Sequence, residues 1–305
     1  MTTLEMQLLA AGASKGPPSI EDVMALYVDG KGRFQTFRQQ CEKAEEFYFG
    51  QFIIPHVEGF DIVRPATARA IVNIATDHVD VDNVAIDVIA PSARAKARAE
   101  RLQRFYIGTW NQIKGPVLRT AVKQAFLYGI TWLKPMYNPD MWPDSPIFDD
   151  FDDEVDYKAA LEEFLDKRRI AFPLDCKNVN PKNLIWDDSR TKRKWAIEYY
   201  DRAVREIGAR YPEWVPGTDS GLTDWMEYWD EEWYGFIAGG QWVEGPHRHY
   251  YGFLPFVPVI PGNTPEWDSG YIHLRFQGLL TPVMNLLESQ ARLASQYEAI
   301  IRQFA

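Results

Sequence analysis

The residues best suited to metal chemistry in this sequence are two histidines. His247 and His249 stand two apart on a predicted strand, so both imidazoles would share one face, with Glu244 close by. This set raises the hypothesis of a metal-dependent hydrolase. The other three histidines are scattered, and the chain has no H-E-x-x-H motif. We favour the simpler interpretation, two polar residues on the exposed face of a β-meander.

Other catalytic signatures are missing from the sequence. The acidic run at 149–154 offers oxygen ligands for calcium, but it lacks the Asp-x-Asp-x-Asp-Gly rhythm, so we favour a solvated loop. Gly30-Lys31 is followed by Gly32 instead of Ser or Thr, which excludes a Walker A motif. There is no G-x-S-x-G elbow, and Cys41 and Cys176 are far apart. We therefore expect no enzyme activity, catalytic residue, metal or cofactor.

Two clusters could bind nucleic acid or sugar. Four tryptophans, at 225, 229, 233 and 242, could stack bases or sugars, although such residues more often form strand core and subunit contacts. The cluster Arg190, Lys192, Arg193 and Lys194 could contact phosphate, but a charged turn before a strand is the commoner explanation. We favour the structural interpretation for both.

Composition limits the partners of this chain. Its 305 residues are 46% hydrophobic, which is enough for a sizeable core. The net charge is −10, the opposite sign to that of a protein that grips phosphates, so any DNA contact should be loose or confined to a local basic strip. We identify no signal peptide and no run of 18 apolar residues, and we expect no membrane association.

The stretch 116–137 predicts a helix that runs into a strand. Apolar residues recur at three- and four-residue steps as far as Phe126, Gly129 stops the helix, and an extended segment follows from Ile130. Further helices are predicted at 20–27 (breaking at Gly30-Lys31-Gly32), 34–48, 67–78, 93–110 and 157–168. The second half of 80–89 alternates as a strand does.

The carboxyl-terminal half predicts strands and one long helix. Extended pieces are expected at 170–179, 183–187 and 195–199, and a meander at 225–236, 241–251 and 256–260. Asp201 is predicted to cap a helix, and the longest helical pattern runs over 277–305. The prediction is an α+β fold with a flexible arm at 1–18, a main domain at 19–270 and a long helix at 271–305. Because that helix stops in mid-pattern, we expect the natural protein to continue.

The order of these segments resembles that of tailed-bacteriophage portal proteins, the rings at the capsid vertex through which DNA passes. The resemblance covers roughly residues 35–305 and rests on the whole set in sequence, since no single motif is diagnostic. The matching pieces are Phe47-Tyr48-Phe49-Gly50, the helix and strand at 69–88, the helix and strand at 123–134, the strand turn at 180–188, Tyr200-Asp201-Arg202, the segment 251–257, and Gly278 before the last helix.

The resemblance implies a wing-like α+β domain whose last helix leads to a stem, with the clip, second stem helix and crown beyond Ala305. It implies a virion protein, assembled in the host cytoplasm into a ring of about twelve subunits. Its partners would be double-stranded DNA, terminase, the major capsid protein and a head–tail adaptor. Six residues are candidates for the subunit interface: Leu279, Leu286, Gln290, Leu293, Tyr297 and Ile301. The alternatives are the hydrolase above or another virion or adaptor protein.

Overall fold

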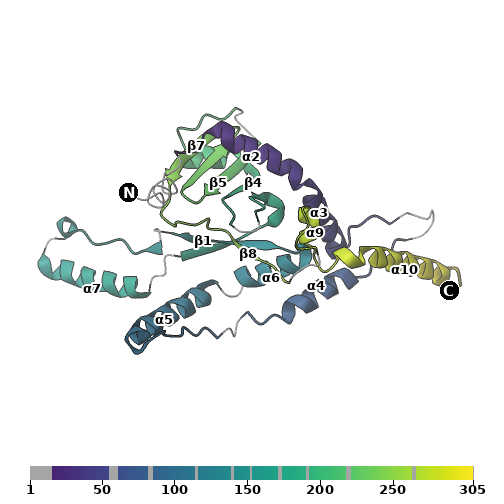
Figure 1. The fold of residues 1–305 in the computed structure, drawn as a ribbon, viewed down its shortest axis with the longest axis horizontal. Helices are drawn as coiled ribbons and strands as arrows, with labels where there is room; N and C mark the ends of the chain where they lie inside the picture. Colours follow the sequence, from purple (N-terminus) through teal and green to yellow (C-terminus); the bar gives the residue numbers. More distant parts are fainter. Residues whose placement is uncertain are drawn as a thin grey trace, which may run out of the picture. The chain divides into compact units, whose positions relative to one another are not determined.

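The computed structural model describes residues 16–54, 61–81, 85–113, 116–138, 141–151, 153–170, 174–189, 192–217, 221–262 and 266–304. The predicted arm at 1–18 therefore lies almost entirely outside the described residues. The chain divides into two compact units, each built from segments that are distant in sequence (Figure 1). Unit 1 comprises 1–40, 180–255 and 266–275, and unit 2 comprises 41–179, 256–265 and 276–305. The fold is mixed α+β, as predicted.

Unit 1 is organised around a five-stranded antiparallel sheet in the order β3-β4-β5-β6-β7. Its strands are β3 (Leu184–Trp186), β4 (Trp195–Ala203), β5 (Leu222–Asp230), β6 (Trp233–Ala238) and β7 (Gln241–Arg248). On one face Ile197, Met226 and Ile237 pack against Val23 of helix α2 (Ile20–Arg33). On the other face Trp225 packs against Ile207 of α8 (Val204–Arg210). Each face is thus covered from within the unit.

Helix α2 begins where the sequence predicts and ends later. The Ser19 hydroxyl accepts a hydrogen bond from the Asp22 N–H at 3.1 Å, which caps the helix. The predicted break at Gly30-Lys31-Gly32 is wrong, because the helix continues to Arg33. Gly30 lets α2 pack closely on β3, because a Cβ at this position would lie 2.1 Å from Cγ2 of Ile185. Helix α3 (Gln35–Phe49) follows as predicted, and Gly50 takes a left-handed conformation with φ +70°.

The segment 201–260 differs from its prediction in three places. The segment 225–236 is two strands, because Asp230 Oδ1 accepts the N–H groups of Glu232 and Trp233 and so makes a tight turn. Asp201 lies within β4 and caps nothing; α8 starts after Ala203 without a side-chain cap. Strand β8 (Val257–Val259) belongs to unit 2, where it pairs with β1.

Unit 2 joins helices to a three-stranded antiparallel sheet in the order β2-β1-β8. The strands β1 (Thr131–Tyr137) and β2 (Leu174–Val179) pair along most of their length. Besides most of α3, the helices are α4 (Thr67–Asp77), α5 (Lys96–Ile113), α6 (Pro116–Tyr128), α7 (Glu154–Ile170) and α10 (Met284–Phe304). The strand predicted within 80–89 is wrong for the described residues 85–89, which pair with no strand; Ile89 is exposed.

The link from α6 to β1 is confirmed, and two glycines explain its packing. Gly129 has φ +85°, and a Cβ there would lie 2.4 Å from the Gln277 nitrogen. A Cβ on Gly278 would lie 2.0 Å from the Leu127 carbonyl oxygen. This contact lets the Leu279 N–H donate to the Phe126 carbonyl at 2.7 Å. The backbones at 126–129 and 276–279 can therefore touch only because both residues lack a side chain.

The last helix is shorter than predicted. Residues 277–280 are not helical; a 3-10 turn at Thr281–Val283 leads into α10, which spans 21 residues or about 30 Å. In Figure 1, α10 extends away from the sheet of unit 2. None of the helices within the described residues has both the length and the apolar composition needed to cross a bilayer.

Candidate functional site

Helix α10 is anchored to unit 2 through one stripe of its surface. Met284, Leu287 and Ala291 are buried at three- and four-residue steps. One turn further on, the Ser295 hydroxyl accepts a hydrogen bond from the Val63 N–H at 2.9 Å. Near the end of the helix Arg302 forms an ion pair with Asp61. This inner stripe fixes which sides of α10 remain open.

A second apolar stripe on α10 is exposed to solvent. Its members follow at alternating steps of four and three residues: Leu286, Gln290, Leu293, Tyr297, Ile300 and Phe304. The exposed fractions of Leu286, Leu293 and Tyr297 are 69%, 66% and 68%. This spacing is the heptad pattern of a helix that packs along a partner helix. We call this set the outer stripe of α10, and within unit 2 nothing in the described residues buries it.

The outer stripe contains four of the six residues predicted from sequence as interface candidates. Ile301 is exposed at its flank. Leu279 is not on the helix at all: it lies in the turn before α10, where its N–H is bonded to Phe126. Ile300 and Phe304 complete the stripe and were not among the candidates. The alternation of four- and three-residue steps in the sequence is the signal that identifies them.

Of the two histidines predicted on an exposed face, only His247 is exposed, so the prediction is wrong for His249. His249 lies just after β7 and is buried. Its Nε2 lies 2.9 Å from the Asp230 carbonyl oxygen, and its Nδ1 accepts the Tyr251 N–H at 3.4 Å. Both ring nitrogens therefore have partners, and neither is free to bind a metal. His247 is exposed, with Nε2 3.7 Å from a Glu244 carboxylate oxygen. The described residues contain no cluster of three potential metal ligands.

The tryptophans of β5 are core residues, as favoured from sequence. Trp225 is buried, with its ring stacked on Phe236 at 5.4 Å and the Arg202 guanidinium 4.8 Å from its centre. Trp229 is buried and stacks on Tyr234 at 4.8 Å. Burial and a hydrogen bond to Glu244 raise the pKa of the nearby Tyr211 to about 12. These rings stabilise the sheet and present no open stacking platform.

The charged clusters found in the sequence are also engaged locally. Lys192 pairs with Glu231 at 2.8 Å, whereas Arg190 lies outside the described residues. Burial, together with the neighbouring Arg275, lowers the pKa of Arg193. In the acidic run, Asp153 Oδ1 accepts the N–H groups of Val155 and Asp156 at 2.8 Å and so caps α7. Within the described residues, the contacts of both clusters are thus made to neighbouring groups of the chain.

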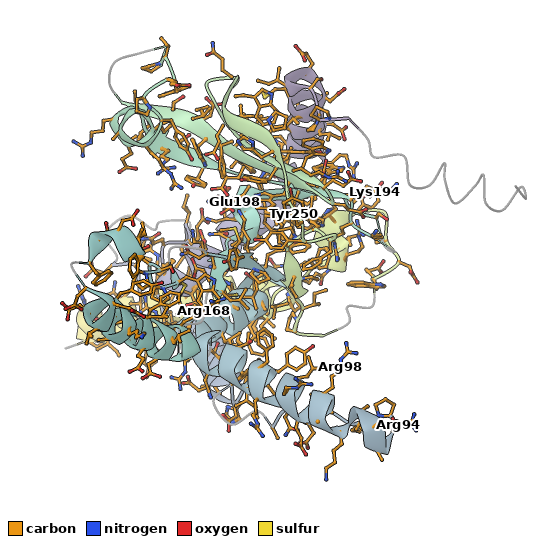
Figure 2. The ribbon with its side chains drawn as sticks, turned by 90° about the vertical axis from the view of Figure 1, so that its left-hand side faces the viewer. Arg94, Arg98, Arg168, Lys194, Glu198 and Tyr250 are labelled. Carbon is orange, nitrogen blue, oxygen red and sulfur yellow. The ribbon has the colours of Figure 1, made fainter. Side chains whose placement is uncertain are left out.

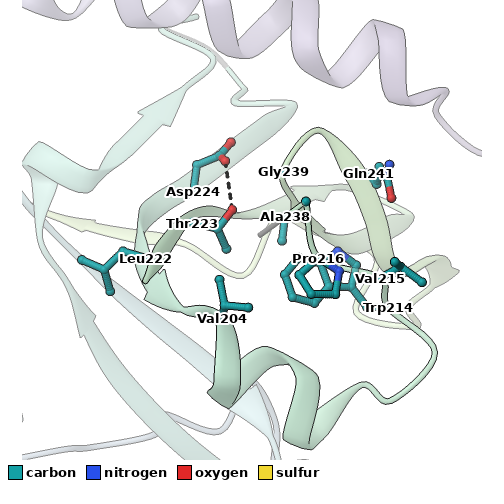
Figure 3. A pocket seen from close by; sticks show the side chains of 11 residues that line it. Val204, Trp214, Val215, Pro216, Leu222, Thr223, Asp224, Ala238, Gly239 and Gln241 are labelled. Atoms are coloured by element: carbon teal, nitrogen blue, oxygen red, sulfur yellow. Dashed lines mark hydrogen bonds between the residues drawn. The ribbon is translucent and has the colours of Figure 1, made fainter. Parts of the chain in front are cut away.

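Unit 1 also has a groove of about 640 Å³ at one end of its sheet (Figure 3). Its lining is mixed, with the apolar Val204, Trp214 and Ala238 beside the polar Thr223, Asp224 and Gln241. Asp224 is the one titratable side chain among its described lining residues, and it accepts a hydrogen bond from the Thr223 hydroxyl at 3.4 Å. The described lining thus offers a binding surface in which no second titratable group is paired with Asp224.

No protein-family model matches this chain, and no curated protein sequence matches it.

Proposed function

We propose that this chain is a structural subunit of a tailed-phage portal ring. In this proposal about twelve copies close a ring at the capsid vertex, and double-stranded DNA passes through it during packaging and ejection. The ring docks terminase, the major capsid protein and a head–tail adaptor. The proposal assigns no catalytic residue. It draws on the order of segments in the sequence and on the outer stripe of α10.

The outer stripe is the observation that carries the proposal. Burying a side chain of the size of Leu or Phe stabilises an assembly by about 1.5–3 kcal/mol, so an exposed row of them favours association. The stripe is separate from the one that anchors α10, so a partner could cover it without unpacking the helix. Gln290 within the row resembles the polar seam residue that fixes register in coiled coils. A helix from a neighbouring copy accounts for the exposed row, for its separation from the anchoring stripe and for the polar Gln290 within it.

The charge of the chain supports the same proposal. A channel must let DNA slide, so strong neutralisation of phosphates would oppose its function. A ring of subunits that each carry a net charge of −10 surrounds DNA with weakly repulsive surface.

The first experiment is the native mass and symmetry of the full-length protein, measured by light scattering and then by electron microscopy. A closed ring of about twelve subunits, with an opening as wide as a DNA duplex, is the expected result. A closed assembly of another symmetry would favour a different virion or adaptor protein. A monomer or dimer would contradict the proposal.

Paired variants of α10 test whether the outer stripe makes the ring. Leu286→Glu with Leu293→Glu places two charges in the stripe, and we expect the ring to dissociate because charges buried without partners are costly. Ser289→Glu with Gln296→Glu adds the same charges to exposed polar positions of the same helix. This control should assemble normally. Equal assembly of both pairs would remove the outer stripe from the interface.

A further inference from the structure

Two helices of unit 2 carry opposite charge on exposed faces. The segment 93–113, which contains α5, has five basic residues and one acidic residue. Helix α7 has five acidic and four basic residues, and the segment before it, 138–153, adds six acidic residues and no basic one. The chain as a whole is acidic. Within unit 2, positive and negative charges are concentrated in separate segments.

Three of the five positive charges lie along one side of α5 and the 3-10 turn before it, Ala93–Ala95. Arg94, Arg98 and Arg101 follow at steps of four and three residues, and Phe105 continues the row. All four side chains are exposed. None of these three arginines forms an ion pair with any residue in the described ranges. We call this row the basic face of α5. Figure 2 shows Arg94 and Arg98 along the helix toward its free end.

The opposite side of α5 holds it to unit 2. Ala99 is buried there, the Trp110 indole donates to the Val81 carbonyl at 3.0 Å, and Gln103 donates to Asp87 at 3.2 Å. The basic face is therefore not the packing face of the helix.

On α7 the negative charges also lie along one side. Ala159 lies three residues after Asp156, and Glu162 and Glu163 lie three and four residues after Ala159; all four are exposed, and we call them the acidic face. Asp156 and Glu162 form no ion pair within the described part of the chain, whereas Glu163 pairs with Lys167 at 2.7 Å. The other side of α7 packs on its own preceding loop: Tyr157 contacts Phe148, and Arg168 lies 5.3 Å from the Trp142 ring.

The two helices also match in length, and both carry exposed apolar residues. The helices have 18 and 17 residues, so they can align over about 25 Å. Phe105 and Tyr106 on α5 are about half exposed, as is Leu165 on α7, while Val155 is 73% exposed. In Figure 2 the free end of α5 points away from α7. Both faces are exposed, so they do not cover each other within one copy and each is open to a second copy.

We infer that the basic face of α5 in one copy docks on the acidic face of α7 in the next copy. This inference rests on the proposed ring and names a second contact between its subunits, separate from α10. DNA is the other polyanion that the arginines could bind. The acidic face of α7 in the same unit would repel DNA, and DNA would leave the exposed residues of α7 unexplained. A second copy accounts for both faces.

Charge reversal with mixing tests the inference. Variant A carries Arg98→Glu and Arg101→Glu, and variant B carries Asp156→Lys and Glu162→Lys. Each alone places like charges in every contact, so we expect each to lose assembly, with at least about a tenfold weaker association. An equimolar mixture restores opposite charges at both kinds of contact in an alternating ring, and should assemble. Lys96→Glu, exposed on another side of α5, is the matched control and should assemble as the wild type does.

The outcomes separate this inference from the proposed function. Mass photometry or sedimentation of A, B, the mixture and the control gives the assembly, and circular dichroism checks folding. A wild-type ring with A and B equally assembled would overturn the helix pairing and leave the portal proposal standing. A mixture that stays dissociated would also overturn the pairing. If A assembles but loses retention on duplex DNA, the basic face belongs to DNA. A monomeric wild type would overturn both.

Discussion

The two units of this protein differ in how fully they cover their own apolar surface. In unit 1 the sheet is packed on both faces by segments of the same unit. Among the described residues, six of the large exposed apolar side chains belong to unit 1 and twenty-three belong to unit 2. In unit 2 they form a continuous row on α10 and a cluster on α5, Leu102 and 105–107. Single exposed apolar residues need no explanation, whereas rows at helical spacing indicate surfaces for partners.

The interior of unit 2 is nevertheless tightly packed. The substitution with the largest expected effect on stability tests this packing. Gly278→Ala places a Cβ 2.0 Å from the Leu127 carbonyl oxygen, so the backbones at 126–129 and 276–279 must separate. We expect a loss of about 3 kcal/mol or more in the free energy of unfolding.

Thermal and denaturant unfolding measure this loss, and hydrogen exchange should show weaker protection in α6 and β1. Gly270→Ala is the control, because a Cβ there meets nothing within 4 Å. If the two variants are equally stable, the close approach of the two backbones is wrong.

A matched pair of tyrosines compares exposed residues in the two units. Tyr297 lies in the outer stripe of α10, and Tyr250 is a single exposed residue of unit 1. Tyr297→Gln should weaken assembly by about 1–2 kcal/mol per contact because it removes a buried aromatic from the interface. Tyr250→Gln should leave assembly unchanged. Sedimentation over a concentration series measures both, and a stronger effect at Tyr250 would reverse the comparison.

The smallest expected effect concerns a charged junction in unit 1. Asp188 accepts hydrogen bonds from Arg33, near the end of α2, and from Arg275, in the short helix α9 (Ile272–Arg275). Burial raises the pKa of Asp188, but the hydrogen bond and charge of Arg33, with the charge of Arg275, outweigh burial and lower the pKa overall.

A lowered carboxyl pKa gives stability that is present above about pH 4 and is lost as the pH falls through the folded-state pKa. The unfolding midpoint should therefore drop between about pH 5 and pH 3. Asp188→Asn should reduce this drop while leaving assembly unchanged at neutral pH. An unaltered pH profile in the variant would show that Asp188 contributes nothing to it.

Local sequence patterns predicted most helices well. Ser19 and Asp22 mark the start of α2, and Gly129 marks the end of α6, because capping needs only neighbouring residues. Gly30 misled the prediction of α2, since its role depends on Ile185, more than 150 residues away. The turn at Asp230 is a local signal that was missed: its carboxylate accepts the N–H groups of Glu232 and Trp233, but the apolar residues on both sides suggested one strand.

For the candidate site too, local spacing was predictable and long-range contacts were not. The spacing of apolar residues over 277–305 predicted a long helix and four members of its outer stripe, Leu286, Gln290, Leu293 and Tyr297. It could not distinguish the stripe that packs inside unit 2 from the stripe left open, because both repeat with the helical period. The sequence also could not predict the burial of His249, because the fold brings together the groups that contact its two ring nitrogens.

The sequence by itself determined the α+β composition, most helix positions, the acidic charge and the lack of recognised catalytic motifs, because these depend on residue types and short-range spacing. Only the tertiary structure decided which strands pair in which sheet, that β8 joins β1, and which faces of α5, α7 and α10 remain exposed. Those features depend on contacts between residues far apart in the chain, and burial is a property of the folded molecule that no single segment encodes.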